Sequence, residues 1–548
     1  MQFKRTLLAL LAWLAGSSAF GCSGGEGETA SQTGGTVATS TGGATATGGS
    51  TSSGSQASTG GTLTTGGASG GNTAAGGSPA GGGSLATGGL ASGGLATGGA
   101  ASEGTGAQAG TGGSAAAVEC GITTTTSAPS PDVGSVGVVE FATDLANPSA
   151  AHIEFGLTTD YGMSAEVDMA AADYRTLLLG LPFGSELNYR INVENGTASC
   201  QSENLTMTLG AAPAGVSAPV TVQSTGGMGQ EPIGSGYVLS AVYQSGVVFI
   251  TNLEGELVWL LDSPLSGVSQ ARMSYDAKHI FVRTGNPSGT AGGGPGGGGP
   301  GGGGGGEIIR ISVDGASQET IEAPTSHHDL TVLPNGSLVY LRRSETVTNC
   351  DVVVEHTVDG QETVLYEFAD AFPSFSRGGT GDDCHVNAVR YNEHDQTLNM
   401  SSLMLDSMIN VGLDGSLNWV VGGNDPTLDM GGLSWDRQHG MHMPDAGTMY
   451  FFNNGGNTQV GDGNSVVLKM LISADSVALD DWFYDSNNQT GSQGDVQVLP
   501  NENVLITYSN DGVSHEVNPE GNLVRTFEYA GPVGYANFRT SLYGPPRR

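Results

Sequence analysis

Three of the ten histidines in this 548-residue sequence, His328, His385 and His439, follow one another at intervals of 57 and 54 residues. An imidazole near neutral pH can act as a nucleophile, as a proton donor or acceptor, or as a metal ligand. Three of them in one place could act together on a single group. We therefore expect a shared site, provided that the fold brings the three histidines together.

The chain around these histidines repeats. With Arg272, His328, His385, His439 and Gly494 as marks, the spacings are 56, 57, 54 and 55 residues. Turns between apolar strands recur in six units, at Glu254-Gly255, Asp314-Gly315, Asp359-Gly360, Asp414-Gly415, Ser473-Ala474-Asp475 and Glu520-Gly521. Units of this length suit four-stranded blades, so we predict an all-β fold with a six-bladed β-propeller over residues 215–548. Blades surround a channel, and residues at one repeat phase should face it.

A sandwich-sized β unit precedes the repeat. Five short apolar runs separated by Pro, Gly and Asn turns predict strands at 136–141, 152–155, 174–181, 187–193 and 205–209. The stretch from Leu179 to Tyr189 resembles the fibronectin type III pattern that places a corner tyrosine after a turn. We predict a fibronectin III-like β-sandwich over residues 119–211, with a structural role as spacer or lid.

Residues 1–118 are expected to contribute no folded domain. Lys4 and Arg5, the apolar run 7–15 and the small residues before Cys22 predict a lipoprotein signal peptide over 1–22, with lipidation of Cys22 and simple secretion as the alternative. Residues 23–118 are mostly Gly, Ser, Thr and Ala and predict a disordered linker. The expected location is therefore outside the cytoplasm, with a lipid anchor in a bacterial membrane.

The remaining cysteines and the net charge limit which covalent links, metal sites and partners are expected. Four cysteines are left besides Cys22, and chain order favours the disulfides Cys120–Cys200 and Cys350–Cys384 in an exported protein. The sequence contains neither a Cys-x-x-Cys motif nor the Cys/His spacing of zinc sites, so a metal site with thiolate ligands is not expected. The net charge of −35 argues against nucleic acid as a partner and against direct contact with anionic lipids.

Four motifs carry a family resemblance. The segments 327–329 (His-His-Asp), 385–389 (His-Val-Asn-Ala-Val), 437–439 (Arg-Gln-His) and 535–539 (Tyr-Ala-Asn-Phe-Arg) resemble, in this order, the arylsulfotransferase propellers. The resemblance covers about 215–548. It implies transfer of a sulfuryl group from a phenolic sulfate ester to a phenol, without a nucleotide donor or other cofactor.

The resemblance also implies roles for residues. His439 is expected to attack the sulfur and to carry the sulfuryl group, while His328 and His385, with Asn387, bind its oxygens or move the phenol proton. The family has an arginine in the strand after the His-x-Asn motif, where this chain has Leu403. Arg437 or Arg390 would then have to supply the cation that meets the sulfate.

Two other function classes remain open at this stage. Three imidazoles with an open position suit a zinc enzyme, to which Asp329 and Asp495 could add oxygen ligands. A surface-displayed binding module without catalysis is the third reading, because propellers serve many functions. A sulfatase is disfavoured because the sequence lacks a Cys-x-Pro-x-Arg motif.

Overall fold

The structure is a computed structural model of the chain. It describes residues 116–214, 220–225, 231–243, 245–261, 265, 267–285, 306–347, 350–372, 384–455 and 464–546. All of these belong to one compact unit, residues 107–548. The predicted signal peptide, Cys22 and almost all of the predicted linker lie outside the described residues. No helix in the described ranges is long and apolar enough to cross a membrane.

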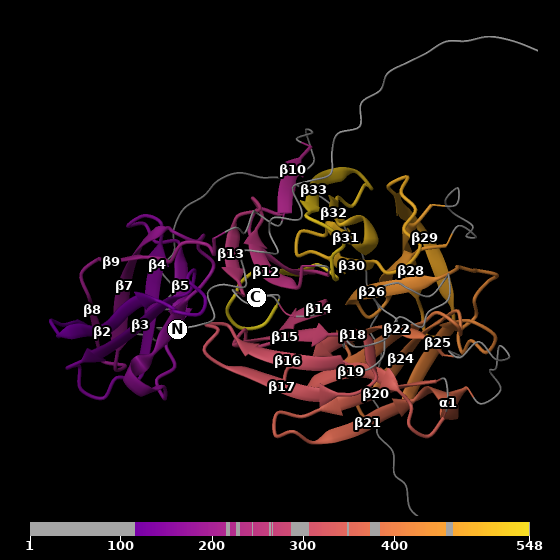
Figure 1. Cartoon of the computed structure of the whole chain (residues 1–548), viewed down its shortest axis with the longest axis horizontal. Coiled ribbons are helices and arrows are strands. Elements are labelled where there is room, and N and C mark those ends of the chain that lie inside the picture. The colour runs from indigo at the N-terminus through magenta and orange to yellow at the C-terminus, as the bar shows by residue number, and fades with distance from the viewer. Residues whose placement is uncertain are drawn as a thin grey trace, which may run out of the picture. The chain divides into compact units, whose positions relative to one another are not determined.

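Strands make up nearly all the regular structure, which confirms the predicted all-β class. The described helices are single turns: η1 (Ala172–Tyr174), α1 (Phe368–Ala371) and η2 (Ser509–Asp511). The strands fall into an N-terminal group, β1 to β9, and a longer C-terminal group, β10 to β34 (Figure 1). Neighbouring strands in a sheet are almost all antiparallel and close in sequence, as expected for hairpin-built β structure.

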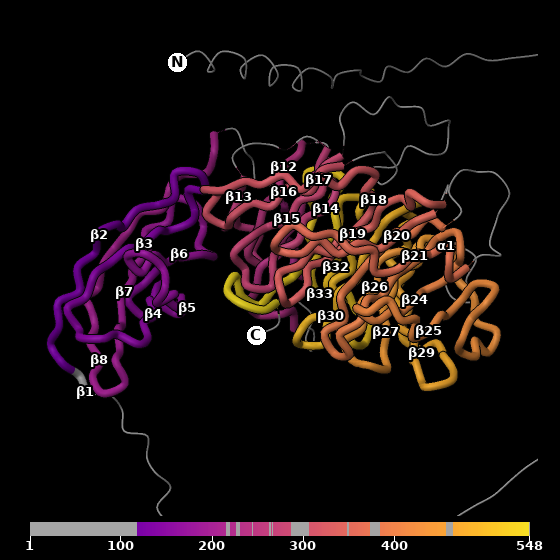
Figure 2. Tube along the Cα trace, turned by 90° about the horizontal axis from the view of Figure 1, so that it is seen from below, coloured from indigo at the N-terminus to yellow at the C-terminus, as the bar shows by residue number. Residues whose placement is uncertain are grey.

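The N-terminal group forms two sheets, whose strands are the early, indigo-to-purple part of the chain in Figure 2. One has the order β1-β8-β7-β4-β5 with β9 paired to β7, and the other has the order β2-β3-β6. The strands are β1 (Ala116–Ala117), β2 (Ile122–Pro129), β3 (Gly137–Thr143), β4 (Ala150–Gly156), β5 (Met163–Glu166), β6 (Thr176–Leu178), β7 (Glu186–Glu194), β8 (Ala198–Gln201) and β9 (Leu205–Thr208).

Alternating residues of these strands form one apolar core, which includes Phe141, Phe155 and Tyr189. The five strands predicted here are confirmed as β3, β4, β6, β7 and β9, within a few residues at their ends. The hydroxyl of Tyr189 lies 2.7 Å from Oγ of Ser127. A disulfide joins Cys120 to Cys200, one of the two pairs expected from chain order.

The C-terminal group forms six sheets within the described residues, numbered I to VI here. Sheet I contains β34 (Asn537–Arg539), β11 (Tyr237–Val242), β12 (Val247–Asn252) and β13 (Leu257–Leu260). Sheet II contains β14 (Val268–Met273), β15 (His279–Thr284), β16 (Gly306–Ser312) and β17 (Gln318–Ala323). Sheet III contains β18 (Ser326–Val332), β19 (Leu338–Arg343), β20 (Asp351–His356) and β21 (Glu362–Glu367).

The other three sheets have the same plan. Sheet IV contains β22 (Val386–Asn392), β23 (Thr397–Ser402), β24 (Ser407–Gly412) and β25 (Leu417–Gly422). Sheet V contains β26 (Gln438–Asp445), β27 (Thr448–Asn453), β28 (Val466–Ile472) and β29 (Val477–Asp485). Sheet VI contains β30 (Asp495–Val498), β31 (Val504–Tyr508), β32 (Val513–Val517), β33 (Leu523–Tyr529) and β10 (Val220–Ser224).

The six predicted turns all lie between the last two strands of a hairpin meander. The glycines of the five Asp-Gly and Glu-Gly turns have φ between 76° and 87°, a conformation that costs glycine little and other residues more. Gly415 shows a second reason for glycine, because a Cβ there would lie 2.4 Å from the carbonyl oxygen of Leu365. In the sixth turn the hydroxyl of Ser473 bonds Ser476 instead. The repeat in the sequence is therefore a repeat of turns in the structure.

Neighbouring sheets contact one another through their inner strands. Contacts run from β11 to β14, β18, β22, β26 and β30 in succession. In Figure 1 the last five of these strands lie toward the middle, while β17, β21, β25 and β29 lie further out. The two ends of the group also meet. Strand β10 pairs with β33, and the side chain of Gln497 in β30 bonds the backbone N–H and C=O of Phe538 in β34 at 2.9 and 3.0 Å.

Candidate active site

The structure brings the three predicted histidines to one end of the inner strands of sheets III, IV and V. His328 lies in β18, His385 directly precedes β22, and His439 lies in β26. The ring centroids of His328 and His385 are 4.8 Å apart. His439 is close enough for its charge, like that of His385, to lower the pKa of His328. Three imidazoles from three sheets therefore share one region, in which His328 and His439 are buried.

Backbone strain marks the same region. His328 and His385 have φ of 54° and 46°, and Arg437 and Gln493, at the same end of the next two inner strands, have 58° and 60°. Left-handed backbone is uncommon for residues other than glycine and persists only where the surroundings enforce it. Register shifts follow directly in β18, β22 and β26. These irregularities turn side chains away from the regular alternation of a strand.

His439 is a neutral imidazole with a defined tautomer. Burial lowers its pKa to about 4. Its Nδ1 lies 3.4 Å from the carbonyl oxygen of Arg437, which can only accept, so Nδ1 carries the proton. Its Nε2 accepts a 3.1 Å hydrogen bond from the backbone N–H of Gln493. The lone pair that a nucleophile needs is therefore on Nε2.

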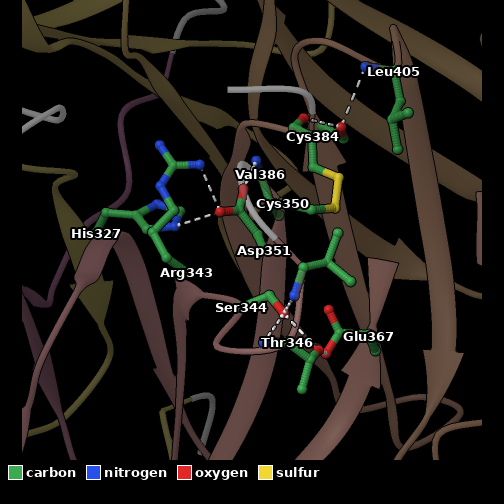
Figure 3. Close-up of a disulfide and its surroundings, with 12 residues drawn as sticks. His327, Arg343, Ser344, Thr346, Cys350, Asp351, Glu367, Cys384, Val386 and Leu405 are labelled. Atoms are coloured by element: carbon green, nitrogen blue, oxygen red, sulfur yellow. Dashed lines mark hydrogen bonds and ion pairs between the residues drawn. A yellow bond between two sulfur atoms is a disulfide. The ribbon is translucent and has the colours of Figure 1, made fainter. Parts of the chain in front are cut away.

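His328 touches a second histidine that precedes it in the chain. Nδ1 of His327 and Nδ1 of His328 are 2.8 Å apart, and Nε2 of His327 is 3.0 Å from Oδ1 of Asp351 (Figure 3). Asp351 is fully buried and also accepts hydrogen bonds from Arg343 at 2.8 Å and from the backbone N–H of Val386 at 2.7 Å. The sequence gave no signal for Asp351, because its partners come from β18, β19 and β22.

A disulfide lies beside this carboxylate. Cys350, which precedes Asp351, is bonded to Cys384, which precedes His385. This is the second pair that chain order favours. The bridge ties the start of β20 to the start of β22, and with them two of the groups in the site.

Residues 353–530 match the family model of the arylsulfotransferases (ASST). The matched range includes His385, Asn387, Arg437 and His439, and it begins after His328. The resemblance predicted from the motifs is confirmed for this part of the chain. The comparison with curated proteins gives no significant match.

The solved structures that match this chain do so with low similarity. A virginiamycin B lyase from Staphylococcus aureus has 13% identity and a TM-score of 0.33, covering 56% of this chain and 87% of its own. A protein of unknown function from Bacteroides caccae has 12% identity and a TM-score of 0.35, covering 55% and 93%. A functionally unknown protein from Desulfotomaculum acetoxidans has 11% identity and a TM-score of 0.35, covering 63% and 95%.

The two arginines considered as replacements for the family's cation are otherwise engaged. Arg390 forms ion pairs with Asp495 and, at 3.8 Å, with Asp329. The side chain of Arg437 is 42% exposed and its Nε lies 3.5 Å from Asp436. Leu403 gives its backbone N–H to the carbonyl oxygen of His385 at 3.0 Å. None of these supplies an unpaired buried cation.

Arg283 in β15 has that property and was missed in the sequence. It is 3% exposed, and its charge acts on the pKa of His328. Its Nη1 donates to the carbonyl oxygen of Ser326 at 3.3 Å, and its Nε has no partner. In the described ranges no carboxylate lies within ion-pair distance of Arg283. Burial lowers its pKa to about 10, so it stays cationic near neutral pH.

In the structure Asn387 and the two aspartates have partners other than the three histidines. The Asn387 amide donates to the carbonyl oxygen of Gln438 at 2.8 Å, next to His439 in the chain. Asp329 pairs with Arg272 at 3.0 Å, and Asp495 pairs with Arg390. These four charged groups form a network further along the inner strands. Of the described residues, no three His, Cys, Asp or Glu side chains are grouped to hold a metal ion.

A cavity of about 120 Å³ lies beyond this network, lined by Arg272, Arg390, Arg539, Tyr391 and His442 among others. Arg272, which was used to mark the repeat, therefore lies at the opposite end of its inner strand from the end where the histidines lie.

Proposed function

We propose that this chain is an arylsulfotransferase-like enzyme that transfers a sulfuryl group from a phenolic sulfate ester to a phenol through a covalent intermediate on His439. The observation that carries the proposal is the state of His439: buried, neutral, with its lone pair on Nε2, and beside two further imidazoles. The match of residues 353–530 to the arylsulfotransferases supports the same chemistry.

In the first step Nε2 of His439 attacks the sulfur, the N–S bond forms, and the S–O bond to the aryl group breaks. The hydrogen bond from the Gln493 N–H must be given up at this point, because the same lone pair cannot serve both. The released phenolate leaves, and an acceptor phenol then attacks the sulfur with loss of its proton. The second transfer regenerates neutral His439 with its proton on Nδ1.

Arg283 meets the negative charge of the sulfuryl group in this proposal. A buried cation without a carboxylate partner is costly, and an anionic substrate removes that cost when it binds. Arg283 thus takes the role for which Arg437 and Arg390 were considered, and Asn387 holds the backbone beside His439. His385 lies next to His328, where it can reach a sulfuryl oxygen.

The finer architecture is part of the same proposal. The six sheets close into a six-bladed propeller over 215–548, supported by the succession of inner-strand contacts and by the pairing of β10 with β33 and of β34 with β11. The N-terminal sheets form a fibronectin III-like sandwich over 119–211. The two disulfides fit an exported protein, and a lipid anchor on Cys22 would hold it to a membrane.

The test uses a chromogenic donor, 4-nitrophenyl sulfate, with 4-methylphenol as acceptor. The wild type should release 4-nitrophenolate, form 4-methylphenyl sulfate, and without acceptor gain the mass of one sulfuryl group in an acid-labile form. His439→Ala should lose all three. His442→Ala is the matched control, because its Nδ1 also accepts a backbone N–H from sheet VI, from Val498 at 2.9 Å, but at the other end of β26. If His439→Ala still transfers sulfuryl groups, the proposal is wrong.

A further inference from the structure

We propose that His328, His327 and Asp351 form a proton relay for the phenol, in which the proton taken from the acceptor leaves its positive charge on His327 beside Asp351. The inference rests on the proposed function and deepens it. Asp351 and His327 have no other assigned role, and neither lies in the range that matches the family model.

The geometry is a continuous chain of hydrogen bonds. Oδ1 of Asp351 lies 3.0 Å from Nε2 of His327, and Nδ1 of His327 lies 2.8 Å from Nδ1 of His328. The two rings are nearly perpendicular, at 89°. All three side chains are buried, so water does not compete for these contacts.

The direction of each bond follows from the carboxylate. Asp351 accepts from Arg343 and from the Val386 N–H, and an ionised carboxylate has no proton to give. Nε2 of His327 is therefore the donor to Asp351. With His327 neutral, its Nδ1 accepts, and so Nδ1 of His328 carries a proton. The lone pair of His328 is then on Nε2, the nitrogen that is not bonded to His327.

A relay is needed because His328 is a weak base by itself. Burial, and then the charges of His327, His385, His439 and Arg283, lower the pKa of His328 well below its usual value. His327 differs from His328 in its neighbour: its Nε2 lies 3.0 Å from Oδ1 of Asp351, the oxygen that also pairs with Arg343 at 2.8 Å.

The transfer balances in atoms and charge. The phenol O–H bond breaks and an N–H bond forms at Nε2 of His328, while the Nδ1–H bond of His328 breaks and one forms at Nδ1 of His327. The phenol oxygen forms its bond to sulfur as the bond from sulfur to Nε2 of His439 breaks. The same steps in reverse protonate a departing phenolate when the donor has a poor leaving group.

The disulfide fixes this relay to the site. Cys350 and Cys384 directly precede Asp351 and His385, and the Val386 N–H bonds Oδ2 of Asp351. Figure 3 shows the bridge, the carboxylate and His327 together. Asp351 is thus a positioning residue that acts through His327, whereas His328 is the group that meets the substrate.

The experiment separates proton transfer from structural support. Asp351→Asn and His327→Gln are compared with wild type in two reactions: the burst of 4-nitrophenolate without acceptor, which needs no proton, and turnover with 4-methylphenol or with pentafluorophenol. We expect an unchanged burst, a loss of about 10²-fold in turnover with 4-methylphenol, and little loss with pentafluorophenol, which is already ionised. The control His356→Gln removes a second histidine–carboxylate contact, 3.5 Å to Glu362, in the same sheet and should change nothing.

Equal losses in the burst and with both acceptors, in variants whose thermal unfolding matches wild type, would overturn the relay and leave a structural role. If Asp351→Asn does not fold, His327→Gln decides by the same comparison. A wild type that shows no burst contradicts the proposed function itself. If the wild type shows a burst but the variants lose the same turnover with both phenols, only the relay is contradicted.

Discussion

The backbone N–H of Gln493 donates a 3.1 Å hydrogen bond to Nε2 of His439, and this contact fixes which nitrogen of the ring holds the lone pair. Gln493 has a left-handed φ of 60°, so its N–H is aimed at the ring by strained backbone. The bond joins sheet V to sheet VI. It stabilises the neutral ring before substrate binds, and it has to break when the N–S bond forms.

The first prediction concerns the pH dependence of sulfurylation. His439 is active when neutral, and burial lowers its pKa to about 4. The rate of the 4-nitrophenolate burst should therefore stay level as pH falls from 7 to about 5 and decline only near pH 4. Stopped-flow measurement of the burst at limiting donor tests this. A midpoint near the ordinary histidine value of about 6.5 would contradict the buried neutral state.

A second prediction concerns stability against pH. Burial lowers the pKa of His515 to about 4, below its value of about 6.5 in the unfolded chain. The unfolded state then binds more protons between pH 6.5 and 4, so stability is fully present above 6.5 and falls as pH falls through this window. For each histidine with a pKa lowered in this way, the free energy of unfolding falls by up to about 1.4 kcal/mol per pH unit within the window. Urea unfolding at pH 7 and 5 should show a smaller loss in His515→Gln than in wild type; equal losses would refute the assignment.

A third prediction tests the cation of the site. In the transfer-dead His439→Ala background, Arg283→Met should weaken binding of 4-nitrophenyl sulfate by about 10- to 100-fold, because a charge-assisted hydrogen bond is lost. Titration calorimetry measures this directly. Arg437→Gln is the control, since that side chain is 42% exposed and lies beside Asp436. If Arg437→Gln weakens binding and Arg283→Met does not, the two assignments are reversed.

A fourth prediction separates the two disulfides. Removing Cys350–Cys384 by double alanine substitution should lower stability by about 2–4 kcal/mol and also reduce turnover with 4-methylphenol, because Asp351 follows Cys350. Removing Cys120–Cys200, which lies in the N-terminal sheets, should lower stability there and leave turnover unchanged. Both readouts come from chemical unfolding and steady-state assays. Equal turnover in the two variants would show that the first bridge does not support the site.

The sequence predicted what is local and periodic. The Asp-Gly and Glu-Gly turns were found because each needs glycine in left-handed backbone, as at Gly415. His328 and His385 were found because they share a repeat position, and the structure gives both a left-handed φ. His439 was also predicted from the repeat spacing, although the left-handed residue in its sheet is Arg437, two positions earlier. The Arg-Gln-His resemblance added the expectation that His439 is the nucleophile.

The sequence could not predict contacts between residues that lie far apart in the chain and on different strands. The charge of Arg283, in β15, acts on the pKa of His328 in β18, and Asp351, in β20, contacts His327 in β18. Arg272 was taken as a repeat mark because the spacing allowed it, yet it pairs with Asp329 in the charged network beyond the histidines. An arginine in a strand looks the same in sequence whether its charge is paired or not.

The last prediction follows from that difference. Arg390 pairs with Asp495, and replacing it with Met leaves a buried carboxylate unpaired, which typically costs about 3–5 kcal/mol. Among the described residues Arg283 has no carboxylate within ion-pair distance, so Arg283→Met leaves no carboxylate without its direct partner and should cost much less stability than Arg390→Met. Inorganic sulfate should raise the unfolding midpoint of the wild type. It should leave the midpoints of the Arg283→Met and Arg283→Gln variants unchanged. If Arg283→Met destabilises the chain as much as Arg390→Met does, Arg283 has a charged partner in the folded protein, and its role as the cation that waits for the sulfuryl group is wrong.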